Sequence, residues 1–108
     1  MSEYTVVHYT ENGRDIFQEW LDNLRDVNGR DAINRTLRKV NRGNFGDHKP
    51  CRDGVWELRI HVGAGYRVYY SISGNEIILL LCGGSKKTQS RDIDNAVDYL
   101  RRFKGVMK

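Results

Sequence analysis

Residues 56–89 read WELRIHVGAGYRVYYSISGNEIILLLCGGSKKTQ, and this segment determines the fold class. Apolar and polar side chains alternate over residues 56–61 and again over 66–72, as they do in strands with one buried face. Residues 77–82 are apolar on both faces, which predicts a central strand covered on both sides. Short glycine-containing turns separate the three strands, so the segment predicts an antiparallel meander.

The residues before this segment predict one strand and two helices. Residues 4–9 are rich in Val, Tyr and Thr and are expected to add a strand at the edge of the sheet. Apolar side chains recur at helical spacing over residues 16–24 and 33–40. The dipeptide at 28–29, Asn-Gly, is expected to end the first helix, and the short connection predicts an αα-hairpin.

Residues 43–54 have the composition of a loop, and a last helix is expected to start near Ser90. The prediction is therefore a single α+β domain over residues 1–108, with the element order β-α-α-β-β-β-α. It comprises a four-stranded, antiparallel-rich sheet, an N-terminal αα-hairpin and a C-terminal helix. We expect the helices to pack on one face of the sheet and to leave the other face partly open.

The composition is that of an ordinary globular domain, with 39% hydrophobic and 30% charged residues among 108. No apolar run approaches the roughly 20 residues of a membrane span, and the first residues do not resemble an export signal, so a cytoplasmic location is expected. Cys82 ends the apolar strand and is expected to be a buried thiol. The three histidines are too far apart in sequence for metal-ligand spacing, so neither a metal nor a cofactor is expected.

Charge is distributed unevenly along the chain. Residues 1–29 carry two basic and six acidic side chains, a net charge of −4, whereas residues 30–108 have a net charge of +8. A strongly basic region suits a polyanionic partner such as nucleic acid. The alternative is a solvated basic surface.

The meander places several polar side chains on one face of the sheet, because residues i and i+2 of a strand share a face. These are Glu57, Arg59, His61, Arg67 and Tyr69. Arg67 either grips a phosphate through its planar guanidinium or pairs with Glu57. Glu57 either acts as a general base or orders the arginines, and His61 either transfers protons or is an ordinary exposed residue. Tyr69 either stacks on a base or belongs to the core.

Lys86 and Lys87 follow the central strand after Gly83-Gly84, a pair that allows an unusual backbone path and a close approach of phosphate. The lysines either neutralise phosphates or form a solvated turn. Gln89 either contacts RNA or helps to cap the last helix.

A second basic group follows one face of the helix expected near residues 33–42. Its members are Arg35, Arg38, Lys39 and Arg42. This stripe either binds RNA or an acidic partner, or is a solvated helix face.

The segments 56–59, 65–69, 81–89 and 92–96 together resemble the RelE/HigB superfamily of bacterial toxins, in particular its addiction-module killer proteins. The resemblance implies a RelE-like fold and the toxin of a type II toxin–antitoxin module. Such toxins cleave mRNA, often on the ribosome, by attack of a ribose 2′-OH that leaves a 2′,3′-cyclic phosphate and a 5′-OH. It also implies a cognate antitoxin, often a helix-turn-helix protein, through which the complex binds operator DNA. Neither a cofactor nor a membrane is implied.

Several relatives carry a His or Tyr just after the last strand, where it protonates the leaving oxygen, but residues 85–89 contain neither. The general acid is therefore not identified by the resemblance. The catalytic candidates are Arg67, Arg59, Lys87, Lys86, Glu57 and His61. Two other functions remain open: a ParE-like toxin that acts on gyrase without cleaving RNA, and a non-catalytic RNA-binding module.

Overall fold

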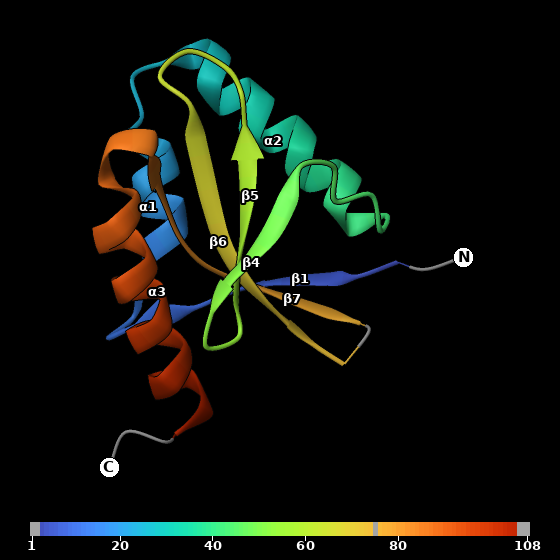
Figure 1. Ribbon diagram of the computed structural model, residues 1–108, viewed down its shortest axis with the longest axis vertical. Helices are drawn as coiled ribbons and strands as arrows, with labels where there is room; N and C mark the ends of the chain where they lie inside the picture. The colour runs from blue at the N-terminus through green and yellow to red at the C-terminus, as the bar shows by residue number, and fades with distance from the viewer. Residues whose placement is uncertain (1–2, 75, 106–108) are drawn as a thin grey trace.

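The structure is a computed structural model that describes residues 3–74 and 76–105 (Figure 1). Its elements are β1 (Thr5–His8), β2 (Thr10–Glu11), β3 (Arg14–Asp15), α1 (Ile16–Asp22), α2 (Val27–Asn41), β4 (His48–Arg52), β5 (Val55–Ile60), β6 (Tyr66–Ser73), β7 (Ile77–Ser85), the 3₁₀ turn η1 (Lys86–Thr88) and α3 (Gln89–Lys104). The fold is α+β, with one mixed five-stranded sheet and a separate two-stranded hairpin. Within the described ranges, none of the helices has the length and apolar character to cross a membrane.

The large sheet has the strand order β1-β7-β6-β5-β4. Strands β5, β6 and β7 form the predicted antiparallel meander, and β1 lies parallel to β7 at the predicted edge position. Strand β7 is therefore interior, as its apolar sequence indicated. The turn between β6 and β7 includes residue 75, which lies outside the described residues.

Helices cover both faces of the sheet, which corrects the expectation of one covered face. Ile78 and Leu80 of β7 belong to the core cluster formed with α1 and α2. Leu79 and Leu81 belong to a second cluster formed with α3. Because successive strand residues point to opposite faces, α3 and the α1–α2 pair lie on opposite sides. The polar sheet face predicted from the sequence is therefore the α3 face.

The four-strand count was wrong, because residues 48–52 form strand β4 rather than part of a loop. The strand pairs with β5 in antiparallel register, with His48 opposite Leu58 and Lys49 opposite Glu57. Pro50 and the charged residues around it are also typical of loops, so the sequence did not indicate a strand here. Proline is tolerated at the edge of a sheet, where its missing N–H is not needed, and charges are common there.

The N-terminal helices also begin and end at other residues than predicted. Asn12 and Gly13 have positive φ values of 54° and 79° and form the two-residue turn of the β2–β3 hairpin. Helix α1 then starts at Ile16, capped by the Asp15 side chain, and has only seven residues. Gly29 lies inside α2, where a Cβ would come within 2.6 Å of Tyr66 Cε2. Close packing, rather than helix termination, requires this glycine.

Candidate functional site

A pocket of about 290 Å³ lies between β5, β6, the turn that joins them and η1. Four basic side chains from these elements line it: Arg59, His61, Arg67 and Lys86. Arg59 and Arg67 lie opposite one another in the β5–β6 register, and His61 follows Arg59 on the same face. The structure thus gathers four of the predicted catalytic candidates around one cavity. We call this cavity the cationic pocket.

Glu57 is buried on the sheet face beside the cationic pocket, with no solvent-exposed surface. Its Oε2 accepts a hydrogen bond from Arg67 Nη1 at 2.8 Å and lies 4.0 Å from Arg59 Nε. Its Oε1 accepts from Gln89 Nε2 at 3.0 Å and faces the Cys51 thiol at 3.8 Å. A carboxylate enclosed in this way is poorly placed to reach a ribose hydroxyl, so the geometry favours Glu57 as the charge partner that orders the arginines.

Arg67 is mostly buried, with 13% of its side chain exposed. Helix α3 covers this face of the sheet and provides Gln89, which shares the Glu57 carboxylate with Arg67. The residue that pairs with Arg67 on the neighbouring strand β7 is Gly84, which has no side chain. The guanidinium is therefore held in a defined orientation at the edge of the cationic pocket, with one nitrogen committed to Glu57.

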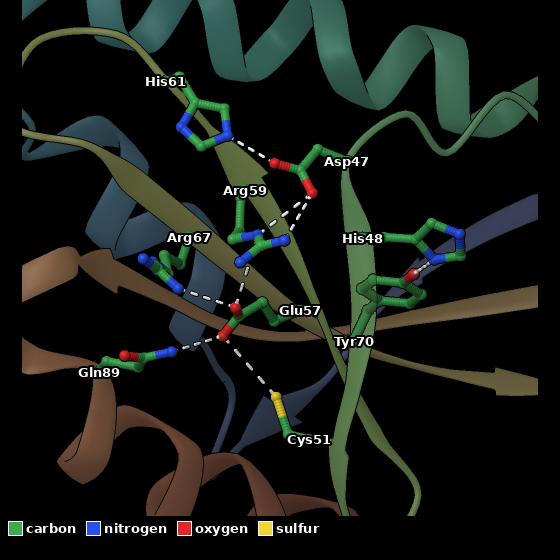
Figure 2. A network of polar contacts seen from close by, with 9 residues as sticks. All are labelled: Asp47, His48, Cys51, Glu57, Arg59, His61, Arg67, Tyr70 and Gln89. Carbon is green, nitrogen blue, oxygen red and sulfur yellow. Dashed lines mark hydrogen bonds and ion pairs between the residues drawn. The ribbon is translucent and has the colours of Figure 1, made fainter.

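Asp47 is a site residue that the sequence did not single out. It directly precedes β4, and its backbone carbonyl accepts a hydrogen bond from the Arg59 N–H at 2.9 Å. Its Oδ1 accepts from Arg59 Nη2 at 2.8 Å, and its Oδ2 lies 2.5 Å from His61 Nε2 (Figure 2). The hydrogen bond with His61, followed by that with Arg59, lowers the pKa of Asp47. Asp47 could have been identified only from the register between β4 and β5, which places residue 47 opposite residue 59.

The turn η1 carries Lys86 and Lys87. The Lys86 N–H donates to the Gly65 carbonyl at 2.9 Å, which joins η1 to the β5–β6 turn and sets Lys86 at the pocket. Lys87 is exposed and does not line the pocket. The structure thus brings only the first lysine of the pair to Arg59 and Arg67.

Gly83 and Gly84 are extended strand residues, so the expected unusual backbone path is not their role. A Cβ on Gly83 would lie 2.4 Å from the Trp20 ring of α1. On the opposite face, a Cβ on Gly84 would lie 1.8 Å from Asp92 Oδ2. The glycine pair therefore allows a helix to pack closely against each face of β7.

Gln89 takes neither of its predicted roles, and Tyr69 belongs to the core. Gln89 is the first residue of α3, and its side chain donates to Glu57 instead of capping the helix. Tyr69 is fully buried among residues packed under α3, and burial raises the pKa of its hydroxyl. This placement corrects the expectation of a base-stacking Tyr69, because its ring has no exposed face.

The basic stripe Arg35, Arg38, Lys39 and Arg42 is exposed on α2, as predicted. However, α2 packs on the sheet face opposite α3, so the stripe does not contribute to the cationic pocket. Arg38 and Arg42 line a separate hollow of about 360 Å³ between α2 and β1. The stripe and the cationic pocket are therefore separate basic surfaces.

The cysteines do not offer a nucleophile. Cys82 is buried, as predicted, and desolvation followed by the nearby Asp92 carboxylate raises its pKa to about 12. Burial and Glu57 raise the pKa of Cys51 to about 11. Both thiols are protonated near neutral pH. Over residues 3–74 and 76–105, no three or more His, Cys, Asp or Glu side chains are grouped to hold a metal ion.

Comparison with known proteins shows to which family this chain belongs. Residues 19–104 match the family described as phage-derived Gp49-like proteins (DUF891). The chain belongs to the Gp49-like family. An uncharacterised Haemophilus influenzae protein is 44% identical over 80 residues, which are 74% of this chain and 81% of that protein. The Gp49-like family is associated with toxin–antitoxin systems and is related to RelE-type toxins. Its matched region contains all the residues of the cationic pocket.

Proposed function

We propose that the protein is the toxin of a type II toxin–antitoxin module and a metal-independent endoribonuclease that cleaves mRNA in the cytoplasm, in association with ribosomes. The observation that carries the proposal is the cationic pocket, where Arg59, His61, Arg67 and Lys86 meet from three parts of the fold. Membership of a toxin–antitoxin-associated family supports the toxin role and implies a cognate antitoxin.

The pocket suits cleavage by the neighbouring ribose 2′-OH. Attack of the 2′-oxygen places additional negative charge on the phosphate, and preorganised cationic donors stabilise such charge best. Arg67 is preorganised by Glu57, and Arg59 by Asp47. Lys86 adds a third charge at the pocket wall, and His61 contributes an imidazole ring, which can donate or accept a proton.

The remaining candidates take supporting roles in this proposal. Glu57 and Gln89 hold Arg67, while Lys87, exposed on η1, contacts a neighbouring phosphate. The α2 stripe binds the backbone of ribosomal or messenger RNA outside the pocket. The antitoxin is a helix-turn-helix protein, and the toxin reaches operator DNA only through it.

The test is induced expression in cells that lack the antitoxin, followed by mapping of RNA 5′ ends. We expect growth arrest and cuts within reading frames, with 5′-OH and 2′,3′-cyclic phosphate ends. His61→Ala with Arg67→Ala serves as the inactive control. Growth arrest with intact transcripts and gyrase–DNA breaks would instead identify a ParE-like toxin. RNA binding without cleavage or arrest would identify a non-catalytic module.

A further inference from the structure

Asp47 is the carboxylate in contact with the histidine of the cationic pocket. One of its oxygens contacts Arg59 and the other contacts His61, so a single side chain orients two pocket residues. The pairing follows from the fold: the β4–β5 register runs on to place residue 47 across from residue 59, next to residue 61. The backbone hydrogen bond between Arg59 and Asp47 anchors the carboxylate at this point.

The contact determines which nitrogen of His61 is bonded to Asp47 and which is not. The pKa of Asp47 is lowered, so its carboxylate is ionised near neutral pH and can only accept hydrogen bonds. His61 Nε2 must therefore carry a proton and donate it to Asp47 Oδ2. The second ring nitrogen, Nδ1, is left to exchange a proton with a molecule in the pocket.

We infer that Asp47 is a positioning residue for His61, and that His61 acts as the general acid of the cleavage proposed above. This inference rests on the proposed function. Asp47 stabilises the positive charge of the imidazolium and turns Nδ1–H toward the leaving oxygen. Arg59 and Arg67 are each paired with a carboxylate, that of Asp47 and that of Glu57, and serve to stabilise charge in this step.

In the proposed step, the ribose 2′-oxygen forms a bond to phosphorus and its proton passes to solvent water. The bond between phosphorus and the 5′-oxygen breaks, and its electron pair remains on that oxygen. The 5′-oxygen takes the proton from His61 Nδ1. The products are a 2′,3′-cyclic phosphate, a 5′-OH and a neutral imidazole whose Nε2–H still donates to Asp47.

The experiment compares two single-stranded RNAs of the same sequence, either free or on the ribosome, whichever the wild-type protein cleaves. One has a normal linkage, and the other has sulfur in place of the bridging 5′-oxygen. A thiolate leaves without protonation, so general acid catalysis is not needed for the second RNA. On the normal RNA, His61→Ala is expected to lose about 10²–10⁴-fold in single-turnover rate and Asp47→Asn about tenfold or more. Both variants are expected to recover near wild-type rates on the sulfur-containing RNA.

Asp53→Asn is the matched control, because it makes the same chemical change in an exposed ion pair with Arg52 outside the pocket. It is expected to cleave both RNAs at wild-type rates. The double variant Asp47→Asn/His61→Ala is expected to be no slower than His61→Ala alone, because the carboxylate acts through the histidine.

Three results would overturn the inference. A wild-type rate for Asp47→Asn on normal RNA would remove Asp47 from the step. Equal losses on the two RNAs would show that Asp47 or His61 serves binding or structure rather than proton transfer. Failure of the wild-type protein to cleave either RNA would refute the proposed function and this inference with it.

Discussion

At the scale of single residues, the central feature is the buried Glu57 carboxylate and the side chains that it orders. Arg67, Gln89 and Cys51 approach it from β6, α3 and β4, so one charge holds together three elements at the pocket. A buried charge of this kind contributes little net stability, but it fixes the geometry of its partners. In the proposed function, Glu57 is therefore valuable because it presents Arg67 in one orientation.

Arg67→Ala is expected to slow single-turnover cleavage about 10²–10³-fold, which corresponds to about 3–4 kcal/mol of transition-state stabilisation. Arg67→Lys is expected to restore little, because a point charge cannot reproduce the two-pronged guanidinium. Removing Arg67 also leaves a buried carboxylate without its closest partner, so the free energy of unfolding is expected to fall by about 3 kcal/mol. Rapid-mixing cleavage assays and urea denaturation measure the two effects.

The double variant Arg67→Ala/Glu57→Gln separates these effects. It removes the buried charge together with its partner, so stability is expected to recover while cleavage stays slow. Recovery of cleavage in the double variant would mean that Arg67 acts through stability alone.

At the scale of elements, the pocket depends on how closely η1 and α3 pack against the end of β7. Asp92 is buried near the start of α3 and accepts a hydrogen bond from Thr88. Gly84 leaves the space that the Asp92 carboxylate occupies. Burial raises the pKa of Asp92, and Thr88 and Arg91 oppose this shift. The packing sets the path of η1 and hence the position of Lys86.

Gly84→Ala is expected to lower the free energy of unfolding by about 1–3 kcal/mol, because the new Cβ overlaps with Asp92 Oδ2. It is also expected to slow cleavage by moving η1. Chemical denaturation with the single variants and Gly84→Ala/Asp92→Ala tests the contact. The double variant is expected to be more stable than the sum of the two single losses predicts. Strict additivity would show that the two residues do not conflict.

The basic stripe also concerns a single element, because its side chains lie on one face of α2. Arg38→Ala is expected to weaken RNA or ribosome binding modestly and to reduce the slope of log affinity against log salt by about one. Binding titrations at several salt concentrations measure this, with Arg14→Ala in β3 as a control of equal charge change. The maximum cleavage rate is expected to stay unchanged. A large loss of that rate would place the stripe in the chemistry.

At the scale of the whole molecule, the cationic pocket and the α2 stripe are two separate groups of basic side chains that lie on opposite faces of the sheet. In the proposed function, a phosphate of the RNA lies in the pocket beside its four basic side chains. In the proposed function, these charges stabilise a phosphorane in the way that metal ions do in metal-dependent nucleases.

Cleavage by the purified protein is therefore expected to be unchanged after dialysis against EDTA and assay without divalent cations. Free RNA is the preferred substrate here, since ribosomes themselves require magnesium. Assays with added magnesium or zinc provide the comparison. A loss of activity in EDTA that either metal restores would contradict the metal-independent mechanism.

Local patterns in the sequence were sufficient for the meander, the edge position of β1, the interior β7 and the basic side chains of the pocket. Alternation along a strand depends only on neighbouring residues, so Arg59, His61 and Arg67 could be assigned to one face without coordinates. The end of α1 was wrong, because Asn28-Gly29 was expected to end it, whereas the helix ends at Asp22 and Gly29 lies inside α2. Strand β4 was missed because its Pro50 and charged residues are also typical of loops.

The sequence by itself determined which residues form the basic sheet face, because strand periodicity is local. Only the tertiary structure decided that α3 covers this face, that Glu57 is buried and that Asp47 contacts His61. These features depend on contacts between residues far apart in sequence, such as Gln89 with Glu57, 32 positions away. The hydrogen bonds of β4 to β5 and the close packing at Gly84 set these distances, and neither has a local pattern from which it could be predicted.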